Sequence, residues 1–296
     1  MNSRDNFMSH NDAAGDWVLV HRNPTYRRDA LPPEIGLRIK WHSPEDERSS
    51  QVFCISAFGG LWQLGDGVSI FNRLLSECLP QLPRSESWNW ELEYIDRSLL
   101  GETGQGMPSN IDVFCHSPKA VVCIESKFLF DAKEGFDSCG QVKAGDCAGF
   151  YGLGSDLKTQ SDANCRLEIK DGKRDPRLYW ELGREYFLED IVRPQNKGER
   201  CPFADSAYQL MRNFVFASVA AGKWRDFSVL AIVPAKTGEL IKKQVEIFRD
   251  SILLPKHRQR IGFATYNQLA QLMIDSPHER SRDLGKFLNE RMATLL

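Results

Sequence analysis

The stretch PSNIDVFCHSPKAVVCIESKF, residues 108–128, decides the fold of this protein. Apolar residues alternate over 110–116 and run continuously over 120–124. Alternation is typical of a strand with one buried face, and a short continuous apolar run is typical of a strand buried on both faces. With Pro118 and Lys119 between them, the two runs predict a β-hairpin. Because Pro-Lys is not a favoured two-residue turn, we expect a wider loop with the same centre.

This hairpin determines which side chains face each other across the two strands. If Ser117 faces Ala120, then Asp112 faces Glu125. Side chains that are directly opposite in an antiparallel pair share one face, with Cβ atoms about 5 Å apart. Lys127 follows Glu125 by two residues and therefore points the same way. Two carboxylates and an ammonium group thus converge at the end of the hairpin away from its turn.

Such a pair of acids predicts a divalent-metal site. Two carboxylates this close repel each other unless a cation joins them, and hard oxygen ligands suit Mg²⁺ or Mn²⁺. The backbone carbonyl of Ser126 is a candidate third ligand. A metal held here would lower the pKa of a bound water and neutralise a phosphate. Lys127 would orient the nucleophile and stabilise charge on the phosphorane.

The acid-x-Lys triplet alone carries little information, since it recurs at 131–133, 156–158, 168–170 and 171–173. Only the triplet at 125–127 closes a buried strand and has an acid in register on the preceding strand. The alternative is a surface hairpin whose charges form an ordinary ion-pair ladder. The apolar run that precedes Glu125 favours the metal site, because it places the charges at the edge of a core.

The rest of the chain predicts an α/β sandwich around a mixed sheet. Its pattern is helical over 49–79, with Asp66 as a candidate cap for the part that follows it. The further predicted elements are a strand at 90–95, a helix at 208–220, a strand at 227–233, a helix at 239–252, a strand at 261–265 and one or two closing helices.

Length and composition predict a globular domain with a polar arm. The chain has 296 residues, of which 42% are hydrophobic, and a formal net charge of -2. Residues 1–45 read as a partly disordered arm, 46–296 as one domain, and about 131–203 as a loop-rich insertion that contains cysteines. The net charge argues against coating nucleic acid by bulk electrostatics and leaves room for a local basic groove. The beginning of the chain lacks a signal-peptide pattern, and no apolar stretch is long enough for a bilayer, so we expect a cytoplasmic protein without a membrane partner.

The order Pro-x-x-x-Asp, strand, Glu-x-Lys, after a helix and a strand, resembles the PD-(D/E)xK nuclease superfamily. More narrowly, the chain resembles a bacterial group of restriction endonucleases in that superfamily. The pieces that carry this likeness are Ser49-Ser50-Gln51, Phe58-Gly59, Leu100-Gly101-Glu102, Glu125-Ser126-Lys127-Phe128, Cys201-Pro202 and 208–213. One departure is that Pro108 stands four residues before Asp112 rather than immediately before it.

The resemblance implies a restriction-endonuclease-like α/β/α sandwich and metal-dependent hydrolysis of phosphodiester bonds, with DNA as the substrate. It places Asp112 and Glu125 on the metal, with Lys127 beside it. It also implies that a further acid can join the site, for which Glu102 and Glu77 are the candidates. Glu102 is favoured by its position between glycines close to Asp112. Either acid could equally be a solvated surface residue.

A polar helix face and four cysteines are further candidates. Gln209, Arg212 and Asn213 share one face of the helix at 208–220 and could hold a water or a phosphate oxygen, or could simply pair internally. A second metal site, holding Zn²⁺ or an iron–sulfur cluster, is conceivable but not favoured, because the cysteines lack a close C-x-x-C pair. These cysteines are Cys139, Cys147, Cys165 and Cys201.

We therefore predict a Mg²⁺-dependent deoxyribonuclease, an endonuclease of restriction or phage-defence type. Cleavage of both DNA strands would suit a homodimer. Two alternatives remain: a catalytically silent nucleic-acid-binding or scaffold protein on the same fold, and a zinc-stabilised interaction module. The basic run at 256–260 reads either as phosphate contacts or as a solvated face. DNA and RNA are not distinguished at this level.

Overall fold

The computed structural model describes residues 50–102, 108–128, 135–143, 149, 177–192 and 200–296. The predicted arm at 1–45 lies outside the described residues. So does much of the predicted insertion at 131–203, including Cys147 and Cys165.

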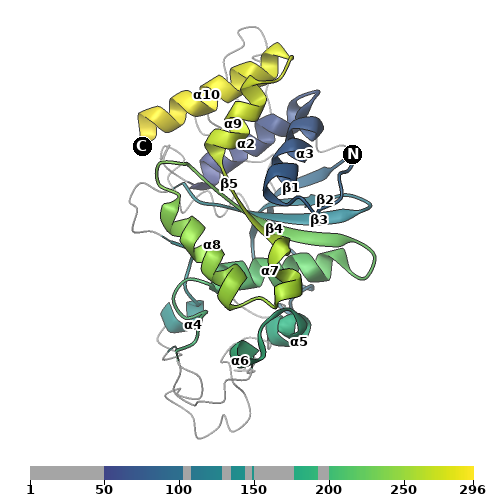
Figure 1. The fold of residues 1–296 in the computed structure, drawn as a ribbon, viewed down its shortest axis with the longest axis vertical. Helices are drawn as coiled ribbons and strands as arrows, with labels where there is room; N and C mark the ends of the chain where they lie inside the picture. Colours follow the sequence, from purple (N-terminus) through teal and green to yellow (C-terminus); the bar gives the residue numbers. More distant parts are fainter. Residues whose placement is uncertain (1–49, 103–107, 129–134, 144–148, 150–176, 193–199) are drawn as a thin grey trace, which may run out of the picture.

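A five-stranded mixed sheet forms the centre of the molecule, as the sequence predicts (Figure 1). The strands lie side by side in chain order. The first three are antiparallel, whereas β3, β4 and β5 run parallel. Every residue of β3 is buried, which confirms the strand covered on both faces. The strands are β1 (Asn89–Tyr94), β2 (Ile111–His116), β3 (Ala120–Ser126), β4 (Asp226–Val233) and β5 (Ile261–Thr265).

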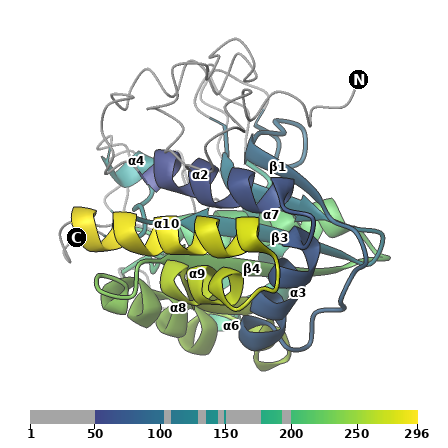
Figure 2. The same cartoon turned by 90° about the horizontal axis from the view of Figure 1, so that it is seen from above.

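Helices cover both faces of the sheet and complete an α/β/α sandwich (Figures 1 and 2). One layer contains α2 (Ser50–Gln63), α3 (Gly67–Cys78), α9 (Tyr266–Ile274) and α10 (Glu279–Leu295). The other contains α7 (Tyr208–Ala221) and α8 (Glu239–Ser251), with the short helices α4 (Gly140–Lys143), α5 (Tyr179–Gly183), η6 (Arg184–Tyr186), α6 (Glu189–Val192) and η7 (Pro255–Arg260). Each layer packs its own apolar core against the sheet.

The β2–β3 hairpin has the predicted register. Val113 pairs with Ile124 and Phe114 with Cys123, so the two strands align as expected from Ser117 facing Ala120. The ladder between the two strands ends at His116 and Val121, so the connection spans residues 117–120 and keeps the expected centre at Pro118-Lys119. Within it, the Ser117 backbone N–H donates to the Ala120 carbonyl at 2.8 Å. The Ser117 hydroxyl accepts hydrogen bonds from the backbone N–H groups of Lys119 and Ala120. The Ser117 side chain thus supplies hydrogen-bond acceptors that stabilise a turn whose residues, Pro and Lys, do not favour it by themselves.

The helical stretch predicted at 49–79 is two helices, α2 and α3, separated by a turn at 64–66. Gly67 permits this tight turn, because a Cβ there would lie 2.1 Å from the Leu61 carbonyl oxygen. Asp66 precedes α3 as expected, but its side chain does not cap the helix. Its carboxylate instead accepts hydrogen bonds from the hydroxyls of Ser276 and Ser281. A contact with the α9–α10 connection therefore replaces the predicted local one.

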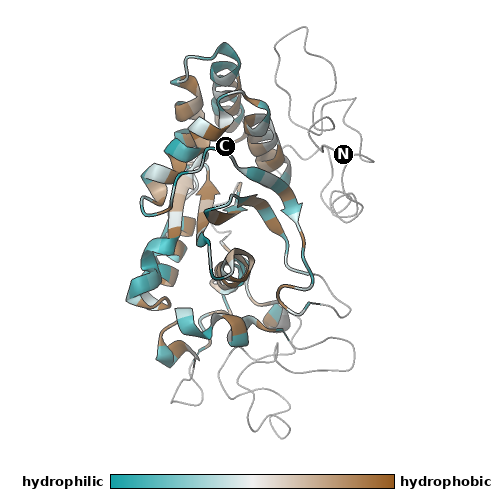
Figure 3. Ribbon diagram, turned by 90° about the vertical axis from the view of Figure 1, so that its right-hand side faces the viewer, coloured by the Kyte–Doolittle hydropathy of each residue, from teal (hydrophilic) through white to brown (hydrophobic). Residues whose placement is uncertain are grey.

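Helix α7 lies against β3 and β4 and is almost wholly buried; Figure 3 shows it end-on, in mostly apolar colours. Three of its buried residues are nevertheless polar, Ser218 and the two amides Gln209 and Asn213. Buried amides require hydrogen-bond partners, and theirs lie at the end of β3.

Candidate active site

The site lies where the β2–β3 hairpin opens, at the end away from its turn. Glu125 and Ser126 end β3, and Asp112 is the second residue of β2. The Ser126 backbone N–H donates to Asp112 Oδ2 at 2.7 Å, so the Asp112 carboxylate extends the ladder between the strands. The predicted register and this hydrogen bond bring Asp112 beside Glu125.

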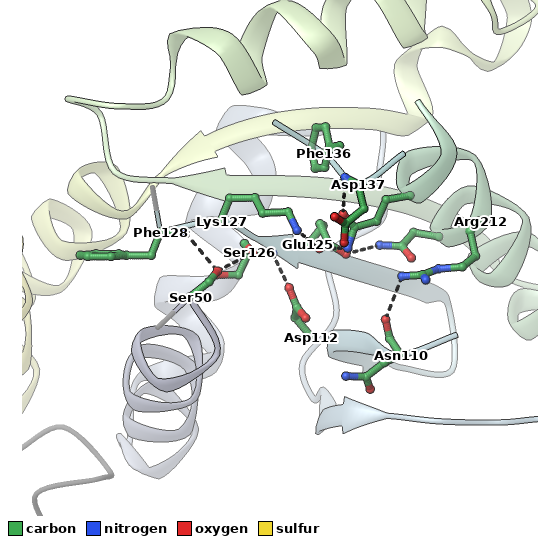
Figure 4. A network of polar contacts seen from close by, with 12 residues as sticks. Ser50, Asn110, Asp112, Glu125, Ser126, Lys127, Phe128, Phe136, Asp137 and Arg212 are labelled. Atoms are coloured by element: carbon green, nitrogen blue, oxygen red, sulfur yellow. Dashed lines mark hydrogen bonds and ion pairs between the residues drawn. The ribbon is translucent and has the colours of Figure 1, made fainter. Parts of the chain in front are cut away.

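Among the described residues, three donors hold Glu125, two from α7 and one from Lys127, which follows β3 (Figure 4). Its side chain is only 1% exposed. From α7, the Gln209 amide donates to Oε1 and the Asn213 amide donates to Oε2 at 2.6 Å. Lys127 Nζ lies 3.3 Å from Oε1. Two neutral amides and one ammonium group therefore keep a buried carboxylate in place.

Negative charge dominates this end of the hairpin. Burial raises the pKa of Asp112 well above its ordinary value, and the nearby Glu125 and Glu93 raise it further. Burial tends to lower the pKa of Lys127, but the attraction of Glu125, Asp112 and Asp137 outweighs it, so that pKa is raised and the ammonium group keeps its proton. Lys127 and the nearby Arg212 do not offset the clustered carboxylates, and the site favours a further cation.

The residues present fit a magnesium-type ion. The donors available are carboxylate oxygens, which hard divalent cations prefer. Among the described residues, no three His, Cys, Asp or Glu side chains form a complete metal-binding group. An ion held by Asp112 and Glu125 would therefore fill its shell with water, carbonyl or phosphate oxygens, as Mg²⁺ commonly does. The Ser126 carbonyl, the predicted third ligand, accepts a hydrogen bond of 2.8 Å from Ser50 and retains its second lone pair.

Arg212 lies on α7, the helix that also carries Gln209 and Asn213. Its Nη2 donates weakly to the Asn110 carbonyl at 3.4 Å, and its Nε has no hydrogen-bond partner among the described residues. Within the described part of the chain, no carboxylate lies within ion-pair distance of this guanidinium. A largely covered cation without an acidic partner can bind an anion such as a phosphate oxygen.

Glu102, the other acid suggested as a metal ligand, has different partners. Its carboxylate accepts hydrogen bonds from the Ser109 backbone and hydroxyl, accepts another from Tyr179 at 2.6 Å, and lies 3.1 Å from Arg177 Nη1. It thereby ties the segment before β2 to α5, rather than joining Asp112 and Glu125. Glu77 is exposed on α3, in the helix layer opposite α7.

The structure places two acids near the site that the sequence interpretation missed. Glu93 lies on β1 between Leu92, which pairs with Val113, and Tyr94, which pairs with Ile111, so it is level with Asp112. It is buried and has a φ of 53°, a left-handed conformation that costs a non-glycine residue about 1–3 kcal/mol and often marks a functional site. An acid in the middle of an alternating strand was the available signal, but the register of β1 is not readable from the sequence.

Asp137 is the second acid near the site that the sequence interpretation missed. Its backbone N–H donates to Gln209 Oε1 at 3.2 Å. Burial tends to raise the pKa of the Asp137 carboxyl, but a hydrogen bond from Lys143 and the positive charges of Lys127 and Arg212 outweigh it, so this pKa is lowered. Figure 4 shows Asp137 above the Glu125–Lys127 pair. No local sequence pattern distinguishes this aspartate from others in the loop-rich region.

The second predicted metal site stays a prediction. Cys139 is buried and Cys201 is partly buried, whereas Cys147 and Cys165 lie outside the described residues. Over the part of the chain that the structure describes, no helix is long and apolar enough to cross a membrane.

A mixed sheet between two helix layers, with an Asp and a Glu-x-Lys where its central hairpin opens, defines a restriction-endonuclease-like protein. The chain belongs to the family of restriction endonucleases associating with ARP, whose model matches residues 3–291. The comparisons with curated proteins and with solved structures gave no match. The family agrees with the resemblance and points to a nuclease-type function.

Proposed function

We propose that this protein is a Mg²⁺-dependent endonuclease that hydrolyses phosphodiester bonds of DNA, in restriction or defence against phage. The observation that carries the proposal is the convergence of Asp112, Glu125 and Lys127 where the β2–β3 hairpin opens. The family membership supports the nuclease class, and the oxygen donors support the choice of metal.

In this proposal Asp112 and Glu125 hold the metal, which when bound supplies an acidified water and neutralises phosphate charge. Lys127, protonated by its acidic surroundings, stabilises negative charge that develops on the phosphoryl oxygens. Gln209 and Asn213 fix the Glu125 carboxylate, so that it does not turn away when substrate binds. Arg212 binds a phosphate oxygen and so positions the DNA backbone.

The test is cleavage of plasmid and of single-stranded DNA in Mg²⁺, Mn²⁺ and EDTA, comparing wild type with Lys127→Ala. We expect metal-dependent cutting that falls about 100-fold to 1000-fold in Lys127→Ala, the usual cost of removing one preorganised charge-stabilising group. Lys243→Ala is the matched control, because Lys243 is exposed on α8. Its activity should equal that of wild type.

Full metal-dependent activity in Lys127→Ala, Asp112→Ala and Glu125→Ala alike would contradict the proposal. DNA binding that persists in EDTA, with no cleavage in any metal, would instead indicate the catalytically silent protein on the same fold. RNA run in parallel decides between the two nucleic acids as substrate.

A further inference from the structure

An exposed tryptophan stands in a concentrated basic surface at the opposite end of β3 from Glu125. Trp224 is 93% exposed, and the only other exposed large hydrophobic side chain among the described residues is Ile247 at 49%. Single exposed hydrophobic residues are common and need no explanation by themselves. The surroundings of Trp224 are what make it unusual.

The turn that carries Trp224 is held firmly at both ends. Gly222, with a φ of 64°, ends α7, and its N–H donates to the carbonyls of Ser218 and Val219. Arg225 Nε donates to the Ala221 carbonyl at 3.2 Å. The Asp226 N–H then donates to Lys119 O at 2.9 Å and begins β4. The indole is therefore presented to solvent by a fixed turn.

Positive charge is concentrated around this turn. Three segments meet at this edge of the sheet, 117–120, 222–227 and 255–260, since Asp226 contacts Lys119 and Arg260 Nη1 donates to the Phe227 carbonyl. Asp226 is their only acid, and it lies 3.7 Å from Arg260. Their cations are Lys119, Lys223, Arg225, Lys256, Arg258 and Arg260.

The concentration is notable because the whole chain has a formal net charge of -2. Burial is the largest cause that lowers the pKa of His116 and His257, and nearby cations lower both further: Arg225 for His116, and Lys256 and Arg260 for His257. Glu185 acts in the opposite direction on His257, but the pKa of this imidazole is still lowered. Glu91, an acid close to the patch, lies 3.7 Å from His116.

We propose that Trp224 and these basic residues form a binding surface for single-stranded nucleic acid. An indole offers a flat face on which an unpaired base stacks, and flanking lysines neutralise the phosphates on either side. A duplex hides its base faces, so an exposed indole favours a single strand over a double one. An acidic protein would satisfy the lysines but would leave the indole without a specific contact.

The surface is separate from the candidate active site. Ala120 and Glu125 stand five residues apart on β3, which corresponds to about 17 Å along the strand. The β2–β3 turn and the start of β4 lie on the right-hand side of Figure 1, the side that Figure 3 turns toward the viewer. The inference rests on the proposed function only for the class of ligand, nucleic acid, and does not require cleavage.

The test measures binding of a labelled oligothymidylate, and of a duplex of equal length, to the full chain in EDTA. We expect Trp224→Ala to weaken oligothymidylate binding about tenfold, with little effect on the duplex. Trp224→Phe should recover most of the affinity, because it restores a stacking face. Ile247→Ala, the matched exposed hydrophobic residue, should bind as wild type does. Lys223→Gln should lower the slope of log affinity against log salt by about 0.7.

Measuring binding in EDTA separates this inference from the proposed function, because the readout needs neither the metal nor cleavage. Binding that depends on Trp224 supports the surface even if no cleavage is found with any metal. Unchanged oligothymidylate binding in Trp224→Ala would overturn the inference. Equal losses for single strand and duplex would also overturn it, and so would binding that depends on Trp224 for polyglutamate but not for the oligonucleotide.

Discussion

At the scale of single residues, the partners of Glu125 explain how a buried acid remains available to a metal. An arginine paired with both oxygens would compete strongly with an incoming cation. Glu125 instead receives hydrogen bonds from the neutral amides of Gln209 and Asn213, and within the described part of the chain its one ion pair is with Lys127 at 3.3 Å. These contacts hold the carboxylate in position without cancelling all of its charge.

The raised pKa of Asp112 predicts a cost to stability at neutral pH. The folded protein keeps this proton more tightly than the unfolded chain, whose carboxyl has an ordinary pKa near 3.8. The free energy of unfolding therefore falls as pH rises from there through the folded value, and then levels off. Asp112→Asn removes the charge and retains an oxygen to accept the Ser126 N–H. In EDTA at pH 7 we expect this variant to be more stable than wild type.

Urea denaturation from pH 4 to pH 8 would measure this effect. The difference between Asp112→Asn and wild type should shrink as pH falls. Glu77→Gln, which neutralises an exposed acid on α3, should leave the profile unchanged. An Asp112→Asn protein less stable than wild type at pH 7 would show that repulsion among the acids is not the dominant effect.

At the scale of elements, the β2–β3 hairpin is the unit that assembles the site. Its short turn sets the register, and the register sets which side chains meet at the far end. The Ser117 hydroxyl stabilises this turn by accepting two backbone N–H groups. A turn and a site at opposite ends of the same hairpin are thus coupled through strand alignment.

Replacing Ser117 should therefore weaken the fold and spare the chemistry. Ser117→Ala leaves the buried N–H of Ala120 without its side-chain acceptor, and we expect a loss of about 1–2 kcal/mol in the free energy of unfolding. Ser117→Asn restores an acceptor that suits turns and should recover most of the loss. Urea denaturation measures both, and nuclease activity at low temperature should stay close to that of wild type. A large loss of activity in a folded Ser117→Ala protein would mean that the turn affects the site more directly.

At the scale of the whole molecule, the site lies where both helix layers meet the end of the sheet. From one layer, α7 contributes Gln209, Arg212 and Asn213. From the other, Ser50 at the start of α2 donates to the Ser126 carbonyl and accepts from the Phe128 N–H. On that same side, the Ser126 and Tyr266 hydroxyls lie 2.7 Å apart. The end of β3 is therefore clamped from both faces.

Metal binding at such a clamped site should stabilise the whole fold. At a Mg²⁺ concentration ten times its dissociation constant, linkage adds about 1.4 kcal/mol to the free energy of unfolding. Thermal denaturation in a Mg²⁺ series should show this for wild type, and Asp112→Asn should lose most of it. An equal Mg²⁺ effect in both proteins would place the ion elsewhere.

Local features of the sequence were enough to predict the main strands and helices and the central hairpin. The strands predicted at 227–233 and 261–265 and the helix predicted at 208–220 agree with the structure to within one residue. Asp112, Glu125 and Lys127 could be placed together because they lie within sixteen residues, on two strands joined by a short turn. Partners distant in sequence, such as Asp66 with Ser276, left no local signal.

The sequence by itself determined the alternation of strands and helices and the meeting of Asp112 with Glu125. Periodicity and a short turn act over a few residues, so they can be read directly from the chain. Only the tertiary structure decided that Glu93 lies level with Asp112, that α7 places its amides on Glu125, and that Glu102 binds Ser109 and Tyr179 instead. These depend on strand register and helix packing between distant segments, which the burial of two apolar cores sets for the molecule as a whole.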